Sequence, residues 1–176
     1  TAVALVAFAA FLVYAQTNWD DYRLRILNLC AVFTIFAVTF NLIYGYTGQF
    51  SLGHAGFAAI GAYAAALLTM TPDQKASNFF LEPIVPLLRN VEWPFLPALL
   101  VGGVLAALAS FLIGWPALRL RGDYLAIATL GFSEIIRVLF VNWQRITNGS
   151  LGLKGIPAHT NVYWSWGAAL VTIFVV

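Results

Sequence analysis

The chain of 176 residues is too apolar for a soluble domain. Its residues are 61% hydrophobic and 9% charged, whereas soluble proteins average about 45–50% apolar and about 25% charged residues. The mean hydropathy of +0.85 therefore indicates a helical protein that crosses the lipid bilayer several times. Because the net charge is only +2 and the basic residues are scattered, we expect no nucleic-acid partner.

The apolar stretches predict an all-α, polytopic transmembrane helical bundle of about six helices. The predicted helices are residues 2–15, 24–44, 55–70, 95–115, 124–143 and a sixth from about 164 to the end. All six tryptophans fall at or beside a segment end, where amphipathic rings favour the headgroup level. The chain begins and stops inside apolar runs, so we expect a fragment whose first and last helices are cut.

A glycine-rich break, residues 45–54, separates the second and third predicted helices. Hydrocarbon contains no water to bond with non-helical backbone, so such backbone is tolerated only where protein covers it or where it lines a cavity. We therefore expect a substrate path here, with an ordinary tight turn at the membrane surface as the alternative. The path residues are expected to be Tyr46, Thr47, Gln49, Ser51 and His54.

Helix capping gives the break a chemical role. Ser51 is predicted to cap a helix that begins at Leu52. The N-terminus of such a helix, if it lies inside the protein, can hold a carboxylate on its backbone N–H groups. His54 is expected to make a neutral polar contact, because the other histidine, His159, is distant in sequence and has no ligand cluster beside it. We expect no metal site.

Other features have mainly structural interpretations. Small residues along the third helix predict close helix packing, and Cys30 is expected to be a buried small hydrophobe. Four prolines between residues 71 and 94 exclude a continuous helix there. That link is interpreted either as a docking surface or as a loose connector.

Apart from Arg25, the second residue of its predicted helix, Glu134 and Arg137 are the only charged residues, of 16, inside a predicted helix. Their i,i+3 spacing allows an ion pair, which reduces the cost of placing either charge in the membrane. Two interpretations remain open. The pair is either structural, at a subunit interface, or it takes part in binding a zwitterion or in gating.

A short basic turn, residues 118–124, precedes the fifth helix, and Asp123 is its expected N-cap. Arg119 and Arg121 either extend to the membrane interface or contact a soluble partner subunit. The sequence contains no catalytic set, no HExxH motif and no phosphate-binding GxxxxGK[ST] motif. We therefore expect a protein that is not an enzyme, with no catalytic residues and no cofactor in this chain.

Three segments together resemble the LivH/LivM permease family of branched-chain amino-acid ABC transporters, and LivM-type subunits in particular. Residues 41–57 (NLIYGYTGQFSLGHAGF) resemble the first motif of that family, and residues 118–137 (LRLRGDYLAIATLGFSEIIR) the second. Residues 146–157 (ITNGSLGLKGIP) are similar to the glycine-rich link that follows, with Asn148 in place of the first glycine. Residues 1–176 are thus interpreted as a partial transmembrane permease domain.

The resemblance implies a multi-pass subunit in the inner membrane of a prokaryote. It implies a second, LivH-like permease subunit, two ATPase subunits that bind ATP and Mg²⁺, and an extracytoplasmic solute-binding protein. Charge alone leaves the orientation open. The resemblance places Arg119 and Arg121 on the cytoplasmic side, and residues 71–94 and 144–163 outside.

The expected substrates are branched-chain amino acids. Related permeases carry urea, amides or other amino acids on the same framework, so these stay as alternatives. An ion-coupled secondary transporter is a second class of function, because a broken helix suits it equally. In a third, the chain is a structural half of a heterodimer whose partner lines most of the path.

Overall fold

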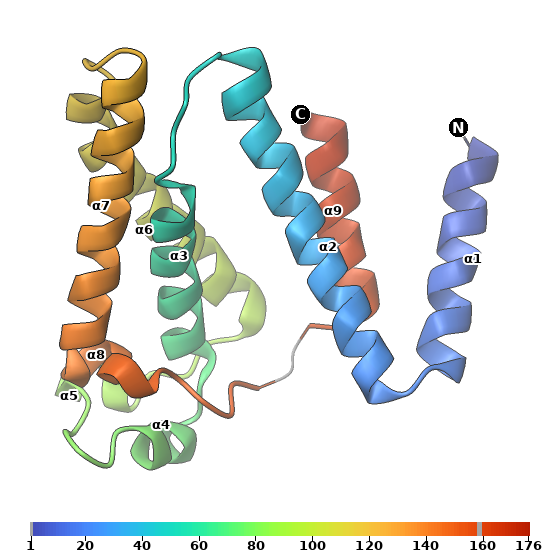
Figure 1. Cartoon of the computed structure of the whole chain (residues 1–176). Coiled ribbons are helices and arrows are strands. Elements are labelled where there is room, and N and C mark those ends of the chain that lie inside the picture. The colour runs from blue at the N-terminus through green and yellow to red at the C-terminus, as the bar shows by residue number, and fades with distance from the viewer. Residues whose placement is uncertain (1, 158–159) are drawn as a thin grey trace. The chain divides into compact units, whose positions relative to one another are not determined.

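The computed structural model describes residues 2–157 and 160–176, and all regular structure in them is helical. The chain divides into two compact units (Figure 1). The first comprises Thr1–Gly48 with Ala158–Val176, and the second comprises Gln49–Pro157. Three helices in the described part are long and apolar enough to cross a membrane, and their spans are Asp21–Tyr46, Phe95–Ala117 and Asp123–Asn142. The prediction of an all-α membrane protein is confirmed.

The first unit contains α1 (Ala2–Asn18), α2 (Asp21–Asn41) with its π-helical continuation η1 (Leu42–Tyr46), and α9 (Val162–Val175). Helices α2 and α9 pack together (Figure 1), and the Ser165 hydroxyl of α9 donates a hydrogen bond to Asn28 Oδ1 of α2 at 2.5 Å. Cys30 is exposed on α2. Its prediction as a buried residue is wrong, because it lies on a side of α2 that no other part of this unit covers.

The second unit contains the remaining helices. They are α3 (His54–Thr69), α4 (Pro72–Asn78), α5 (Pro86–Arg89), α6 (Phe95–Ala117), α7 (Asp123–Asn142), α8 (Gln144–Thr147) and the 3₁₀ turn η2 (Gly149–Leu151). The expected boundaries hold to within a few residues. Asp123 is not the N-cap of α7, because Gly122 occupies that position with a left-handed φ of 57°. Asp123 instead places its carboxylate in the first turn, where the helix dipole favours negative charge.

Helices α3 and α6 form the closest helix pair of this unit. A Cβ atom added at Gly102 of α6 would lie 2.6 Å from the Gly61 carbonyl oxygen and 3.2 Å from Cβ of Ala65. Only glycine fits at that distance, so the two backbones touch directly. The small residues of the third helix do serve close packing, as predicted.

The link between α3 and α6 has a packed structure. Thr71 and Gln74 form a capping box at the start of α4, and Phe79 and Ile84 pack on Leu67 of α3. Lys75 is fully buried, and its ammonium group donates to the carbonyl oxygens of Leu88, at 2.9 Å, and Val91. The link is therefore not the loose connector that was one of its two interpretations.

The close contact at Gly102 can be tested against a control substitution at the next residue, Gly103. Gly102→Ala should destabilise the protein by about 1–3 kcal/mol, because the added methyl group forces α3 and α6 apart. Gly103→Ala meets no atom within 4 Å and should stabilise the helix by up to about 1 kcal/mol. Thermal unfolding of the full-length protein in detergent measures both. Equal effects of the two substitutions would show that the contact does not exist.

The buried lysine makes a second prediction. Lys75→Met should cost about 1–3 kcal/mol, because two carbonyl oxygens lose their donor. Burial lowers the pKa of Lys75, and Glu92 partly opposes this shift. The unfolded chain thus binds the proton more tightly, so the free energy of unfolding rises as the pH approaches the ordinary lysine pKa from below.

Lys75→Met should flatten that rise. The measurement is the thermal unfolding temperature of both proteins between about pH 7 and pH 10. Lys154→Met, at an exposed lysine of the same unit, is the control and should keep the pH dependence. Matching pH profiles for the unmodified and Lys75→Met proteins would contradict the assignment.

Candidate functional site

The second half of the break places the start of α3 beside the interior of α7 (Figure 1). The Leu52 backbone N–H, two residues before α3, donates to the Thr129 hydroxyl at 2.9 Å. Thr129 is the seventh residue of α7, about 9 Å along its axis at 1.5 Å per residue. Helix α3 itself has 16 residues, about 24 Å, which is shorter than the roughly 30 Å hydrocarbon core. It begins inside the span of α7 rather than at its end.

The expected capping by Ser51 is wrong. The N-cap of α3 is Gly53, which forms no side-chain capping bond, and Ser51 lies two residues before it. Residues 47–53 are irregular, and the Leu52 N–H donates to the Thr129 hydroxyl of α7 rather than to a capping side chain of its own segment. One of the backbone donors that a bound carboxylate was expected to use is therefore already occupied.

The predicted path residues fall in both units, and the structure describes each within its own. Tyr46 ends η1 with 73% of its surface exposed, and Thr47 donates its hydroxyl to the Ile43 carbonyl oxygen at 2.5 Å. In the second unit Gln49 is exposed, whereas Ser51 and His54 are half-buried. Gly45 and Tyr46 of the break thus belong to the π-helical turn, and residues 47–53 are irregular.

Helix α3 continues from this point in close contact with α7. A Cβ atom added at Gly56 would lie 3.0 Å from Ile136 Cδ1 and 3.1 Å from the Cα of Ser133. Beside this contact lies an open cavity of about 260 Å³, here called the α3–α7 cavity. Its lining residues on the two helices are Ala55, Gly56, Ala59, Tyr63, Ser133, Glu134, Ile136, Arg137, Phe140 and Val141.

Glu134 and Arg137 form an ion pair on the edge of this cavity. The Arg137 guanidinium donates through Nε to Glu134 Oε2 at 2.9 Å and through Nη2 to Oε1 at 2.5 Å. The Arg137 side chain is nevertheless 66% exposed, and the Glu134 side chain is 55% exposed. An exposed ion pair in the middle of an apolar span is costly against lipid. This face of α7 is therefore one that lipid should not cover.

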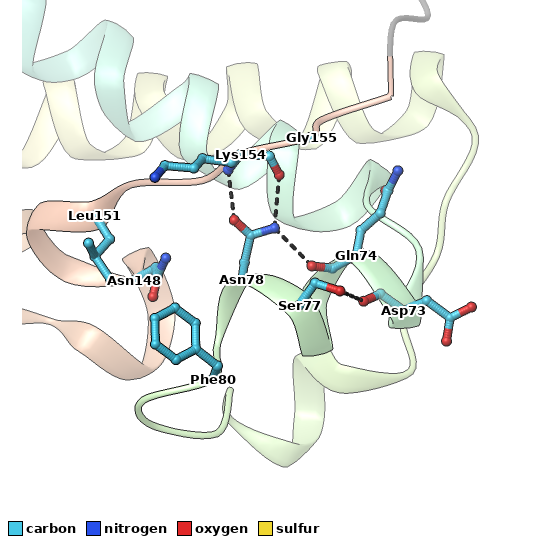
Figure 2. Close-up of a pocket in the computed structure, with 9 residues that line it drawn as sticks. All are labelled: Asp73, Gln74, Ser77, Asn78, Phe80, Asn148, Leu151, Lys154 and Gly155. Atoms are coloured by element: carbon cyan, nitrogen blue, oxygen red, sulfur yellow. Dashed lines mark hydrogen bonds between the residues drawn. The ribbon is translucent and has the colours of Figure 1, made fainter.

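A second cavity, of about 480 Å³, lies outside the apolar helices, between α4 and the segment after α8 (Figure 2). Asn78 joins its two walls. Its Oδ1 accepts from the Lys154 backbone N–H at 2.7 Å, and its Nδ2 donates to the Lys154 carbonyl oxygen at 2.8 Å. Figure 2 shows Phe80 and Leu151 on one side of Asn78 and Asp73 on the other. Asn78 ties together the two links that the sequence predicts to lie on the same side of the membrane.

Nothing in the sequence indicates this role for Asn78. Asparagine is common in polar links, and the partner segment lies 76 positions further along the chain. The bond between Thr129 and the start of α3 is equally hard to predict, because a threonine in an apolar helix usually bonds within its own helix. Thr129 does so here, donating to the Ala126 carbonyl oxygen, and also accepts from Leu52.

The remaining predicted residues have simple placements. Arg119 and Arg121 are exposed in the turn between α6 and α7, and neither forms an ion pair within the described ranges. His159 lies outside the described residues. Across residues 2–157 and 160–176, no group of three or more His, Cys, Asp or Glu side chains is arranged to hold a metal ion.

Comparisons with known proteins identify the family. Residues 22–174 match the family described as "Branched-chain amino acid transport system / permease component". The chain is 42% identical over 135 residues to the high-affinity branched-chain amino acid transport system permease protein LivM of Escherichia coli (strain K12). It is 40% identical over 135 residues to the protein of the same name from Salmonella typhimurium.

Each alignment covers 77% of this chain and 27% of the relative, so the chain spans about a quarter of the length of these proteins. No solved structure matches it. The two motifs and the glycine-rich link at residues 41–57, 118–137 and 146–157 all lie within the matched region. The chain belongs to the permease-component family of branched-chain amino-acid transport systems.

Proposed function

We propose that this chain is part of a transmembrane permease subunit of an ATP-driven importer for branched-chain amino acids. The observation that carries the proposal is the family match over residues 22–174. The name of both relatives, a high-affinity branched-chain amino acid transport system permease protein, supports the same substrate class. The chain itself is not an enzyme in this proposal, and separate ATPase subunits bind ATP and Mg²⁺.

The break contributes to the translocation path in this proposal. Apart from Phe50 and Leu52, its residues are polar or lack side chains, and many are exposed in their own unit. Hydrocarbon cannot bond with irregular backbone, so other parts of the protein, another subunit or a water-filled passage must cover it. Tyr46, Thr47, Gln49, Ser51 and His54 are the residues proposed to line that passage.

The proposed partners follow from the family to which the chain belongs. A second, LivH-like permease subunit completes the path, two ATPase subunits bind on the cytoplasmic side, and a solute-binding protein docks outside. Arg119 and Arg121 face the cytoplasm in this arrangement. The link formed by α4 and α5, held to the segment after α8 through Asn78, faces outward in the inner membrane of a prokaryote.

Reconstitution of the full-length chain with these partners tests the substrate and the energy source. Vesicles should accumulate leucine in an ATP-dependent manner, and urea measured in parallel should not exceed the level of vesicles without the permease. Uptake that persists without ATP but collapses when the ion gradient is dissipated would assign the chain to ion-coupled transporters. Faster uptake of urea than of leucine would overturn the substrate class.

The role of the path residues can be tested by substituting Tyr46 and, as a control, a second exposed tyrosine outside the break. Tyr46→Ala should lower leucine uptake by up to roughly tenfold, the equivalent of about one hydrogen bond. Tyr22→Ala is the control, because Tyr22 is on the same helix-forming segment and is 74% exposed, against 73% for Tyr46. Gln49→Ala and His54→Ala extend the test into the second unit. Uptake unchanged in all of these variants would favour a path lined mainly by the partner subunit.

A further inference from the structure

The α3–α7 cavity combines an ion pair with an apolar pocket near the middle of a membrane-spanning helix. Glu134 is the twelfth residue of the 20-residue helix α7, about 16 Å from its start and close to its middle. The ion pair lies on the edge of the cavity rather than buried between helices, since both side chains are more than half exposed. A charged ligand in the cavity could therefore reach both side chains within the membrane span.

The two charges match the two charged groups of an amino acid. Arg137 presents a planar guanidinium, which binds carboxylates with two hydrogen bonds. Glu134 presents a carboxylate, which accepts from an ammonium group. The pair as a whole is neutral, and so is a zwitterion. Exchange of the internal pair for two pairs with the ligand therefore needs no accompanying proton or ion.

The remainder of the cavity is shaped for an aliphatic side chain. One turn along α7 from the charged pair lie Phe140 and Val141, opposite Ala59 of α3. The Phe140 ring is held by an edge-on contact with Tyr63, with the ring centroids 4.8 Å apart. The volume of about 260 Å³ equals roughly eight or nine water molecules at liquid density. That is enough for an amino acid with a branched side chain.

We propose that the α3–α7 cavity is a binding site for a zwitterionic, branched aliphatic amino acid within the membrane. Arg137 holds its carboxylate, Glu134 holds its ammonium group, and Phe140 and Val141 contact its side chain. The proposal rests on the proposed import function and adds a site to it. Urea carries no charged group, so it can form hydrogen bonds but no ion pair with Glu134 and Arg137, and the same geometry favours amino acids.

Protection of an introduced cysteine tests the site directly. The full-length chain carrying Val141→Cys, with the exposed Cys30 replaced by serine, is assembled with its permease and ATPase partners in vesicles, without the solute-binding protein, and labelled with a maleimide. Leucine should slow the labelling, and urea should not. Leu139→Cys is the matched control, because Leu139 is 52% exposed on the same helix but does not line the cavity. Its labelling should ignore leucine.

Charge variants separate binding from a structural role. Glu134→Gln or Arg137→Gln should raise the leucine concentration needed for protection by roughly tenfold to a hundredfold, because a charge-assisted contact is lost. The reversed pair, Glu134→Arg with Arg137→Glu, keeps an ion pair on the helix. It should assemble with its partner subunits as the unmodified chain does, measured by size-exclusion chromatography, but leucine should not protect it at the original concentration.

The outcomes are decisive and distinct from those of the import assay. Leucine that fails to protect Val141→Cys, or protects Leu139→Cys equally, overturns the site. Full protection in the reversed-pair variant also overturns it and leaves a structural ion pair. ATP-dependent leucine uptake by the unmodified importer together with no protection refutes this site alone. Uptake of urea but not leucine refutes the import proposal itself.

Discussion

The absence of water from the hydrocarbon core is the constraint on which this structure depends. Every backbone and charged group at that depth needs a partner from the protein or access to an aqueous passage. In the second unit, the Thr129 hydroxyl accepts a hydrogen bond from the Leu52 N–H just before α3. Glu134 and Arg137 of α7 pair with each other. Both solutions lie on α7, which makes this helix the scaffold for the irregular start of α3.

Close packing makes those partners available. Gly56 brings α3 against Ser133 and Ile136 of α7, and Gly61 brings it against Gly102 of α6. Helix α3 thus has a glycine contact to each of its two long neighbours. Because α3 is short and wedged between them, its start can lie within the span of α7. Small residues in lipid permit this approach where larger side chains would separate the helices.

The apolar stretches and the tryptophan positions were sufficient to predict the six apolar helices, three of which are long enough to cross a membrane, because the bilayer limits both helix length and the position of amphipathic rings. The site was less predictable. The ion pair followed from i,i+3 spacing alone, whereas Ser51 was wrongly expected to cap α3. Capping preferences describe local contacts, and here a threonine 77 residues away in sequence supplies the bond. Burial of Lys75 was equally hidden, since its acceptors come from a separate turn of the same link.

The functional argument therefore depends on tertiary contacts more than on motifs. The family motifs identify a permease, but many residues within them serve packing, as Gly53 and Gly56 do against α7. A charged pair within a membrane span is expected to face other helices or a water-filled cavity rather than lipid. Glu134 and Arg137 stay exposed beside a cavity, which leaves their hydrogen-bonding groups accessible to a ligand or to a neighbouring subunit. A neighbouring subunit could satisfy the charges, yet it would not need an aliphatic pocket one helical turn away, and this combination favours a bound amino acid.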